Sequence, residues 1–144
     1  MINLGATNTE KTVYWMFKMS ESYKQNMYLK MLAKRLKGCN ETETIKNIFN
    51  FCMDSLNYEP QQEQIIESPI YILSKGISNC VNYSILIRTL CDILNIKCYF
   101  VTVAYSEHID SEHVFTVVLA DNKSIIIDCV YCKVFNVRVI NKTQ

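Results

Sequence analysis

One cysteine of the sequence stands where a catalytic thiol would be expected. Cys80 follows turn-forming residues that begin at Gly76, and a strongly apolar run typical of a buried helix comes after it. The first turn of a helix favours a thiolate through its unpaired backbone N–H groups and the helix dipole. Because the thiolate is the nucleophilic form of cysteine, this position predicts covalent catalysis with Cys80 as the nucleophile.

Two histidines are candidates for the base that such a thiol needs. The base takes the thiol proton and later returns it to the leaving group. His108 lies in a polar loop, whereas His113 opens a predicted strand, in which the alternation of side chains determines where its ring points. His113 is therefore the candidate base.

The register of a predicted hairpin places an aspartate beside His113. Asp121 and Asn122 form a credible turn because both residue types tolerate positive φ. A loop of two or four residues centred there pairs Asp128 with Phe115. His113 then lies diagonally opposite Asp128 on the same face, where the carboxylate can orient the imidazole. A loop of three residues would move Asp128 to the other face.

The helices that would position these residues follow from hydrophobic spacing. In the first, the apolar positions include Phe17, Tyr28 and Met31, and packing in the core is their expected role. Asn40 can cap the second helix, and Asn95 ends the third. We predict helices at residues 9–36 with a break near 20–22 and a stop at Gly38, at 40–56 and at 80–94.

The segments between and after the helices complete an α+β prediction. Residues 57–78 contain both prolines and predict a long connection with little regular structure. Helices first and an antiparallel sheet afterwards give α+β, with the helix of Cys80 packed on the sheet. We predict strands at 97–105, 113–119, 124–128 and 131–140, in one domain over residues 1–144 with a helical part at about 8–56 and a core at about 57–140.

Composition and charge exclude several classes of function. Fifteen basic residues against 14 acidic ones give a net charge of +1, which provides no electrostatic reason to bind nucleic acid or an anionic membrane. The apolar runs are shorter than the roughly 20 residues of a membrane-spanning helix, so we expect a soluble protein. Seven cysteines without a paired pattern, and a start without the pattern of a secretory signal, predict a cytoplasmic or other reducing compartment. The abundance of Asn, Ile and Lys fits an AT-rich genome such as that of a phage or its host, so association with a virion is a second expectation.

Most of the other cysteines fit a structural role. Cys52 and Cys91 fall on apolar faces of predicted helices and Cys98 lies within a predicted strand, so we interpret them as small buried hydrophobic residues. Cys129 and Cys132 have the spacing of half a zinc site or of a redox pair. A zinc site would need four ligands, with His108 and His113 completing it, and this remains an alternative.

The candidate residues lie within a longer resemblance, which covers roughly residues 42–131. The chain resembles the transglutaminase-like superfamily of cysteine peptidases, in which a cysteine opens a central helix packed on an antiparallel sheet that supplies a histidine and an aspartate. The chain departs from the usual pattern at Ser78, Asn79 and Phe115, where the family often has glycine, aspartate and tryptophan. The resemblance is carried, in order, by Tyr58, Cys80-Val81-Asn82-Tyr83-Ser84-Ile85-Leu86, Leu94-Asn95-Ile96-Lys97, His113-Val114-Phe115 and Ile127-Asp128.

The resemblance implies Cys80 as nucleophile, His113 as general base and acid, and Asp128 as orienting group. We therefore expect acyl transfer on an amide bond of a protein or peptide substrate through a thioester. Hydrolysis, as in a peptidase or amidase, is favoured over transfer to an amine, and the chemistry needs no metal or organic cofactor. The alternative is a structural or interaction domain that does not use this chemistry, for example a phage virion or assembly protein.

Overall fold

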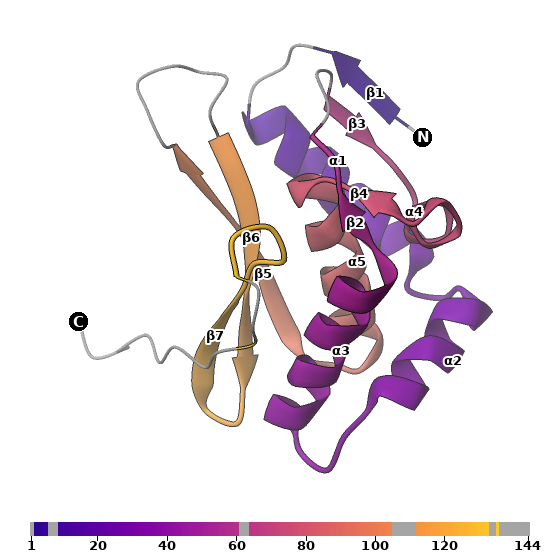
Figure 1. The fold of residues 1–144 in the computed structure, drawn as a ribbon, viewed down its shortest axis with the longest axis vertical. Helices are drawn as coiled ribbons and strands as arrows, with labels where there is room; N and C mark the ends of the chain where they lie inside the picture. Colours follow the sequence, from indigo (N-terminus) through magenta and orange to yellow (C-terminus); the bar gives the residue numbers. More distant parts are fainter. Residues whose placement is uncertain (1, 6–8, 61–63, 105–111, 133–134, 136–144) are drawn as a thin grey trace.

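The computed structural model describes residues 2–5, 9–60, 64–104, 112–132 and 135. Figure 1 shows two layers, with a three-stranded antiparallel sheet on one side and helices on the other. The central helix α5 (Cys80–Ile93) packs against both the sheet and the other helices. The predicted α+β class, with the helix of Cys80 on an antiparallel sheet, is confirmed.

The first three helices lie in the N-terminal part of the chain, and side-chain caps mark where the second and third begin. The first predicted helix is divided into α1 (Thr9–Tyr23) and α2 (Met27–Leu36), with the break at residues 24–26 instead of 20–22. Asn26 caps α2 by accepting a hydrogen bond from the backbone of Leu29, which explains why the new helix begins there. Asn40 caps α3 (Glu41–Ser55) as predicted.

The expected core face of the first two helices is partly wrong. Phe17, Tyr28 and Met31 are exposed. The helical spacing of the apolar residues is real, but the chain has more of them than one buried face can hold. The residues of α1 and α2 that are buried are Met16, Met19, Ser20, Leu29 and Ala33.

Residues 57–78 were predicted to have little regular structure, and this is wrong. The segment contains β2 (Asn57–Tyr58), β3 (Gln64–Ile66), α4 (Pro69–Lys75) and β4 (Ile77–Ser78). Proline is tolerated at the first turn of a helix, where its missing N–H has no partner to lose. The strands are too short to produce a periodic pattern, so the sequence resembles a loop.

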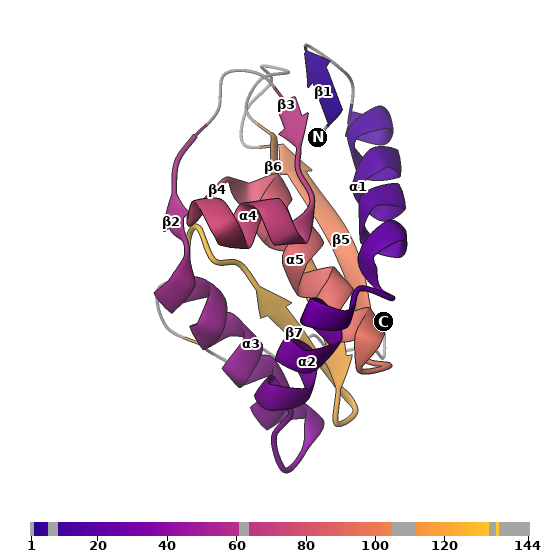
Figure 2. The same ribbon diagram turned by 90° about the vertical axis from the view of Figure 1, so that its right-hand side faces the viewer.

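The short strands pair with distant partners. β2 runs parallel to β4, and β3 is antiparallel to β1 (Ile2–Gly5), a strand that the sequence pattern did not predict. In Figure 2, α1 and α3 flank α5, while α4 lies near its N-terminal end. The short sheet β2–β4 therefore guides the chain directly into Cys80.

The main sheet has the order β5 (Lys97–Ala104), β6 (Glu112–Ala120) and β7 (Lys123–Ile127). Asp121 and Asn122 have φ values of 49° and 63°, so both occupy the left-handed region that a two-residue hairpin turn requires. The predicted fourth strand is not observed at Tyr131 and Cys132, and nearly all of its remaining residues lie outside the described part.

The core lies between α5 and the sheet. α5 is buried along most of its length, and its apolar residues contact those of α3 and of the sheet. Cys52, Cys91 and Cys98 belong to this core, which confirms their interpretation as buried hydrophobic residues. A rigid central helix of this kind holds its first residue, Cys80, in a fixed place.

Candidate active site

Cys80 is the first residue of α5, at the place predicted from the sequence. Asn79 is the N-cap, and its side chain accepts a hydrogen bond of 2.9 Å from the backbone N–H of Asn82. Upstream, Ser78 pairs with Tyr58 in a parallel arrangement, and this pairing holds the segment that leads into the helix. Cys80 is partly exposed, whereas the side chains that follow it are mostly buried. The thiol therefore lies at the boundary between a rigid core and solvent.

His113 and Asp128 are in direct contact on the sheet. Nε2 of His113 lies 2.7 Å from Oδ2 of Asp128, and the two residues are only 5% and 8% exposed. The observed register pairs Thr116 with Ile127, so Asp128 lies one step further, alongside Phe115 as predicted. Of the loop lengths considered from the sequence, the two-residue loop is therefore the one observed.

The Asp128 carboxylate is held by the turn that follows β7. Its Oδ1 atom accepts hydrogen bonds from the backbone N–H groups of Val130 and Tyr131, at 3.0 Å and 3.2 Å. One oxygen is thus bound by the backbone while the other faces the imidazole. A carboxylate fixed in this way determines the orientation of the ring it contacts.

Electrostatics favour an ion pair between these two residues. Burial lowers the pKa of His113, but hydrogen bonds and electrostatic interaction with Asp128 and Cys80 outweigh it and raise the pKa to about 9. Burial raises the pKa of Asp128, but the hydrogen bonds from His113 and from the backbone lower it overall. At neutral pH the pair is therefore an imidazolium and a carboxylate, with Cys80 interacting with the same ring.

Aromatic side chains surround the imidazole. The ring of Phe115 stacks near His113 with centroids 6.0 Å apart, and the ring of Tyr131 meets it edge to face at 4.7 Å. Tyr58 pairs with Ser78, two residues before Cys80, and its pKa is raised by burial and by electrostatic interaction with Cys80 and Tyr131. Tyr58 and Tyr131 are both exposed, so two aromatic rings of the site face solvent.

A polar network behind the nucleophile had no recognisable signal in the sequence. Glu67 is 1% exposed, forms an ion pair with Lys75, and contacts the buried amide of Asn82. A glutamate and a lysine eight residues apart in an apparent loop do not indicate burial. The involvement of Tyr131 was missed for a similar reason, since that residue was assigned to a strand.

The alternative of a zinc site finds no support in the part of the chain that the structure describes. No group of three or more potential metal-binding side chains occurs there. Cys129 is buried, and contact with Cys52 and burial raise its pKa, which disfavours the thiolate that zinc requires. His108 lies outside the described residues.

The fold and the geometry agree with the comparison of the sequence with known families. A family described as a transglutaminase-like domain matches residues 27–136. The chain belongs to this family. The matched range includes Cys80, His113 and Asp128, and it begins after the end of α1. No match was found among curated proteins.

Solved structures share the transglutaminase-like fold at low sequence identity. A candidate cysteine protease from Cytophaga hutchinsonii is 20% identical, with a TM-score of 0.56 over 76% of this chain and 39% of that chain. A candidate protease from Parabacteroides distasonis is 15% identical, with a TM-score of 0.63 over 81% of this chain and 25% of that chain. LapG of Legionella pneumophila is 17% identical, with a TM-score of 0.56 over 88% of this chain and 75% of that chain.

Two of these neighbours are much longer than this chain. The chain spans 39% of the Cytophaga protein and 25% of the Parabacteroides protein, so it corresponds to one part of those longer chains.

Among the helices of the described residues, none has both the length and the apolar character needed to cross a membrane.

Proposed function

We propose that this transglutaminase-like domain catalyses acyl transfer on amide bonds, with Cys80 as nucleophile, His113 as general base and acid, and Asp128 as orienting group. The observation that carries the proposal is the 2.7 Å contact between His113 Nε2 and Asp128 Oδ2, on a ring that also interacts with Cys80. The side chains to which we assign these roles come from the start of α5, from β6 and from the residue that follows β7. Peptide hydrolysis is the favoured reaction.

The two ring nitrogens of His113 have different roles in the proposed mechanism. Nε2 is held by Asp128, so Nδ1 is the nitrogen that exchanges a proton with the Cys80 thiol. Because the pKa of His113 is raised to about 9, the imidazolium form is available at neutral pH to accompany a thiolate. A thiolate formed at Cys80 would therefore have a cation beside it.

The reaction then follows from these charges. The thiolate attacks the amide carbonyl carbon, and the oxygen becomes negative in a tetrahedral intermediate. The backbone N–H of Cys80, at the positive end of α5, is our proposed donor to that oxygen. His113 gives its proton to the departing amine, the C–N bond breaks, and a thioester remains. Water, deprotonated by His113, then attacks the thioester and releases a carboxylic acid and the thiolate.

An amine in place of water would give transamidation through the same thioester. The named neighbours favour hydrolysis, since two of the three are candidate proteases. The exposed rings of Tyr58 and Tyr131 beside the thiol suit an extended peptide, whose backbone and apolar side chains can pack on aromatic surfaces. A protein or peptide is therefore the proposed substrate.

Alkylation of the thiols tests the proposal. The protein is treated with iodoacetamide from about pH 5 to 9, and the modified peptides are identified by mass spectrometry. Cys80 is expected to react first and at unusually low pH, and the exposed Cys39 provides an internal control. The His113→Ala variant should remove the low-pH reactivity of Cys80 without changing that of Cys39. Equal rates at Cys80 and Cys39 would instead favour an interaction domain that does not use the thiol.

A further inference from the structure

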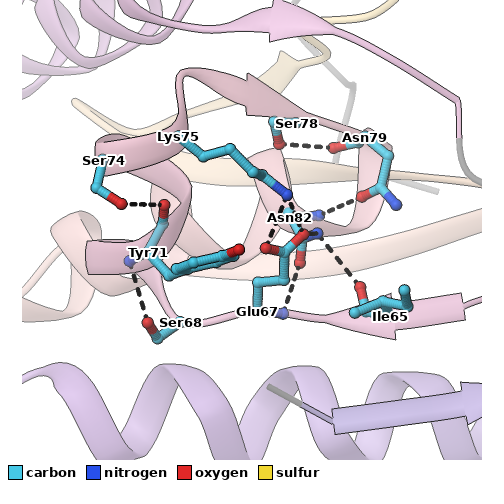
Figure 3. Close-up of polar contacts among 9 residues, drawn as sticks. All are labelled: Ile65, Glu67, Ser68, Tyr71, Ser74, Lys75, Ser78, Asn79 and Asn82. Atoms are coloured by element: carbon cyan, nitrogen blue, oxygen red, sulfur yellow. Dashed lines mark hydrogen bonds and ion pairs between the residues drawn. The ribbon is translucent and has the colours of Figure 1, made fainter.

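We propose that Asn82 is a positioning residue, which together with Glu67 holds the first turn of α5 so that the Cys80 thiol meets the His113 imidazole. The inference rests on the proposed function for its catalytic consequence, but the placement of the thiol can be measured without turnover. Figure 3 shows the network, in which Asn82 lies between Glu67 and Ile65 and Lys75 contacts the carboxylate of Glu67.

The side chain of Asn82 joins the helix to β3. It is completely buried, two residues after Cys80. Its Oδ1 atom accepts a hydrogen bond from the backbone N–H of Glu67 at 3.1 Å, and its Nδ2 group donates to the carbonyl of Ile65 at 3.3 Å. These two partners lie on either side of Ile66, the last residue of β3. The carboxamide therefore fixes the helix relative to the strand in direction as well as distance.

Glu67 connects this contact to the chain that enters α5. Both of its carboxylate oxygens accept hydrogen bonds from Nζ of Lys75, at 2.7 Å and 2.8 Å, and Oε1 lies 3.4 Å from Nδ2 of Asn82. Lys75 is the last residue of α4, and only the cap Gly76 and the residues of β4 and Asn79 separate it from Cys80. The nucleophile is thus held from both sides, through Lys75 before it and through Asn82 after it.

The polar character of this network is costly if its only role is to stabilise the fold. A carboxylate and an amide lose their hydration when they are buried, and apolar residues of similar size often stabilise a protein at least as well. Apolar packing is present next to the network, since Ile66, Val81 and Ile85 belong to one buried cluster. Directional hydrogen bonds define an orientation that apolar contacts do not, and a displacement of about 1 Å at a reacting atom can cost about 100-fold in rate.

The titration of His113 provides a direct measurement of thiol placement. The ring signals of His113 are followed by NMR as pH is varied, in the wild type and in Asn82→Ala, Cys80→Ser and the double variant. Because the interaction with Cys80 helps to raise the pKa of His113, Asn82→Ala should lower it in the wild-type background. In the Cys80→Ser background the same substitution should have no further effect. An unchanged titration in Asn82→Ala would overturn the proposal.

Thr89→Val is the matched control for loss of stability. Thr89 is also a buried polar residue of α5, and it forms a hydrogen bond of 3.2 Å with Ser20 further along the helix from Cys80. All variants are compared at a temperature at which circular dichroism shows them folded. Thr89→Val should leave both the His113 titration and Cys80 alkylation unchanged, whereas Asn82→Ala should slow alkylation about 10- to 100-fold. An equal slowing by both variants would contradict a positioning role.

A charge exchange keeps the test informative if Asn82→Ala does not fold. Asn82→Asp places a second carboxylate against Glu67, where the two oxygens would repel. Adding Glu67→Gln restores a donor between the two side chains and should recover most of the His113 titration and of the alkylation rate. A double variant no better than Asn82→Asp would show that this contact does not place the thiol.

The outcomes separate the two proposals. If the wild type cleaves no amide but Asn82→Ala shifts the His113 titration, the positioning role stands and the proposed function fails. If the wild type is active and both the titration and the rate are unchanged in Asn82→Ala, the function stands and the positioning role fails.

Discussion

The imidazole of His113 and the carboxylate of Asp128 are 2.7 Å apart, although neither residue is more than 8% exposed. A charged pair this close in a buried place loses hydration and is stable only when further hydrogen bonds satisfy its remaining atoms. The backbone N–H groups of Val130 and Tyr131 do so for the second oxygen of Asp128. The arrangement therefore links the charge state of the site to the stability of the fold.

The free energy of unfolding should fall as pH rises through the alkaline range. In the folded protein the pKa of His113 is about 9, above the ordinary value of 6.5, so folding favours the protonated ring. The resulting stabilisation is complete below about pH 6.5 and is lost as pH rises through about 9. Urea unfolding at intervals across this range should show the decline, and in His113→Gln it should be reduced.

In the acid range, the contribution of the same pair to the free energy of unfolding should depend on pH with the opposite sign. The pKa of Asp128 is lowered in the folded protein, so its contribution is present above the ordinary value of 3.8 and is lost as pH falls through the lower folded value. Asp128→Asn should reduce both pH dependences. A wild-type profile that stays flat from pH 6.5 to 9 would show that His113 is not charged in the folded state.

Asp128→Asn should also lower activity far more than stability. The amide is similar in size to the carboxylate, but it cannot supply the negative charge that favours the imidazolium and the correct tautomer. For the analogous aspartate of serine proteases, which have an unrelated fold, this change costs about 10⁴ in rate, so we expect a loss of about 10²- to 10⁴-fold in kcat/KM for peptide hydrolysis. Cys80→Ala provides the background rate, and a change of only a few-fold would remove Asp128 from the proposed mechanism.

Some features of the site were predictable because local chemistry determines them. Gly76 and Asn79 mark the turn and the cap before Cys80, and two consecutive residues that tolerate positive φ give the hairpin register. From that register alone, Asp128 was placed beside His113, as observed. These signals lie within a few residues of the features that they specify.

Other features depend on contacts between distant segments and left no local pattern. The pairing of β1 with β3 joins strands of four and three residues that lie far apart in the chain. Likewise, burial of Glu67 depends on Lys75 and Asn82 arriving from two different helices. The exposure of Tyr28 and Met31 could not be predicted from spacing, because hydrophobic residues are also common on surfaces.

Removal of one buried hydroxyl should have a measurable cost. Tyr83 lies on α5, and its OH group donates a hydrogen bond of 3.1 Å to the carbonyl of Leu56, at the end of α3. Tyr83→Phe would leave that carbonyl without this donor, and we expect a loss of about 1–2 kcal/mol in the free energy of unfolding. Tyr99→Phe is the control, since Tyr99 is exposed on β5. Equal effects of the two substitutions in urea unfolding would contradict this account.

Gly76→Ala should destabilise the protein through backbone conformation and not through a steric clash. Gly76 ends α4 with φ of 74°, and a Cβ atom added there would meet only the Ser55 carbonyl oxygen, at an ordinary distance of 3.8 Å. The left-handed conformation costs a residue with a Cβ about 1–2 kcal/mol. Because alanine also reduces the entropy of the unfolded chain, the net loss should be about 1 kcal/mol in urea unfolding.

Gly76→Asn distinguishes this cause from a packing effect. Asparagine adopts the left-handed conformation more readily than alanine, although its side chain is larger. If φ is the cause, Gly76→Asn should therefore destabilise the protein less than Gly76→Ala, whereas a packing effect would give the reverse order. The turn at Gly76 directs the chain into β4 and then to Cys80. A folded variant has formed this turn, so both variants should keep the low-pH alkylation of Cys80 under conditions in which they are folded.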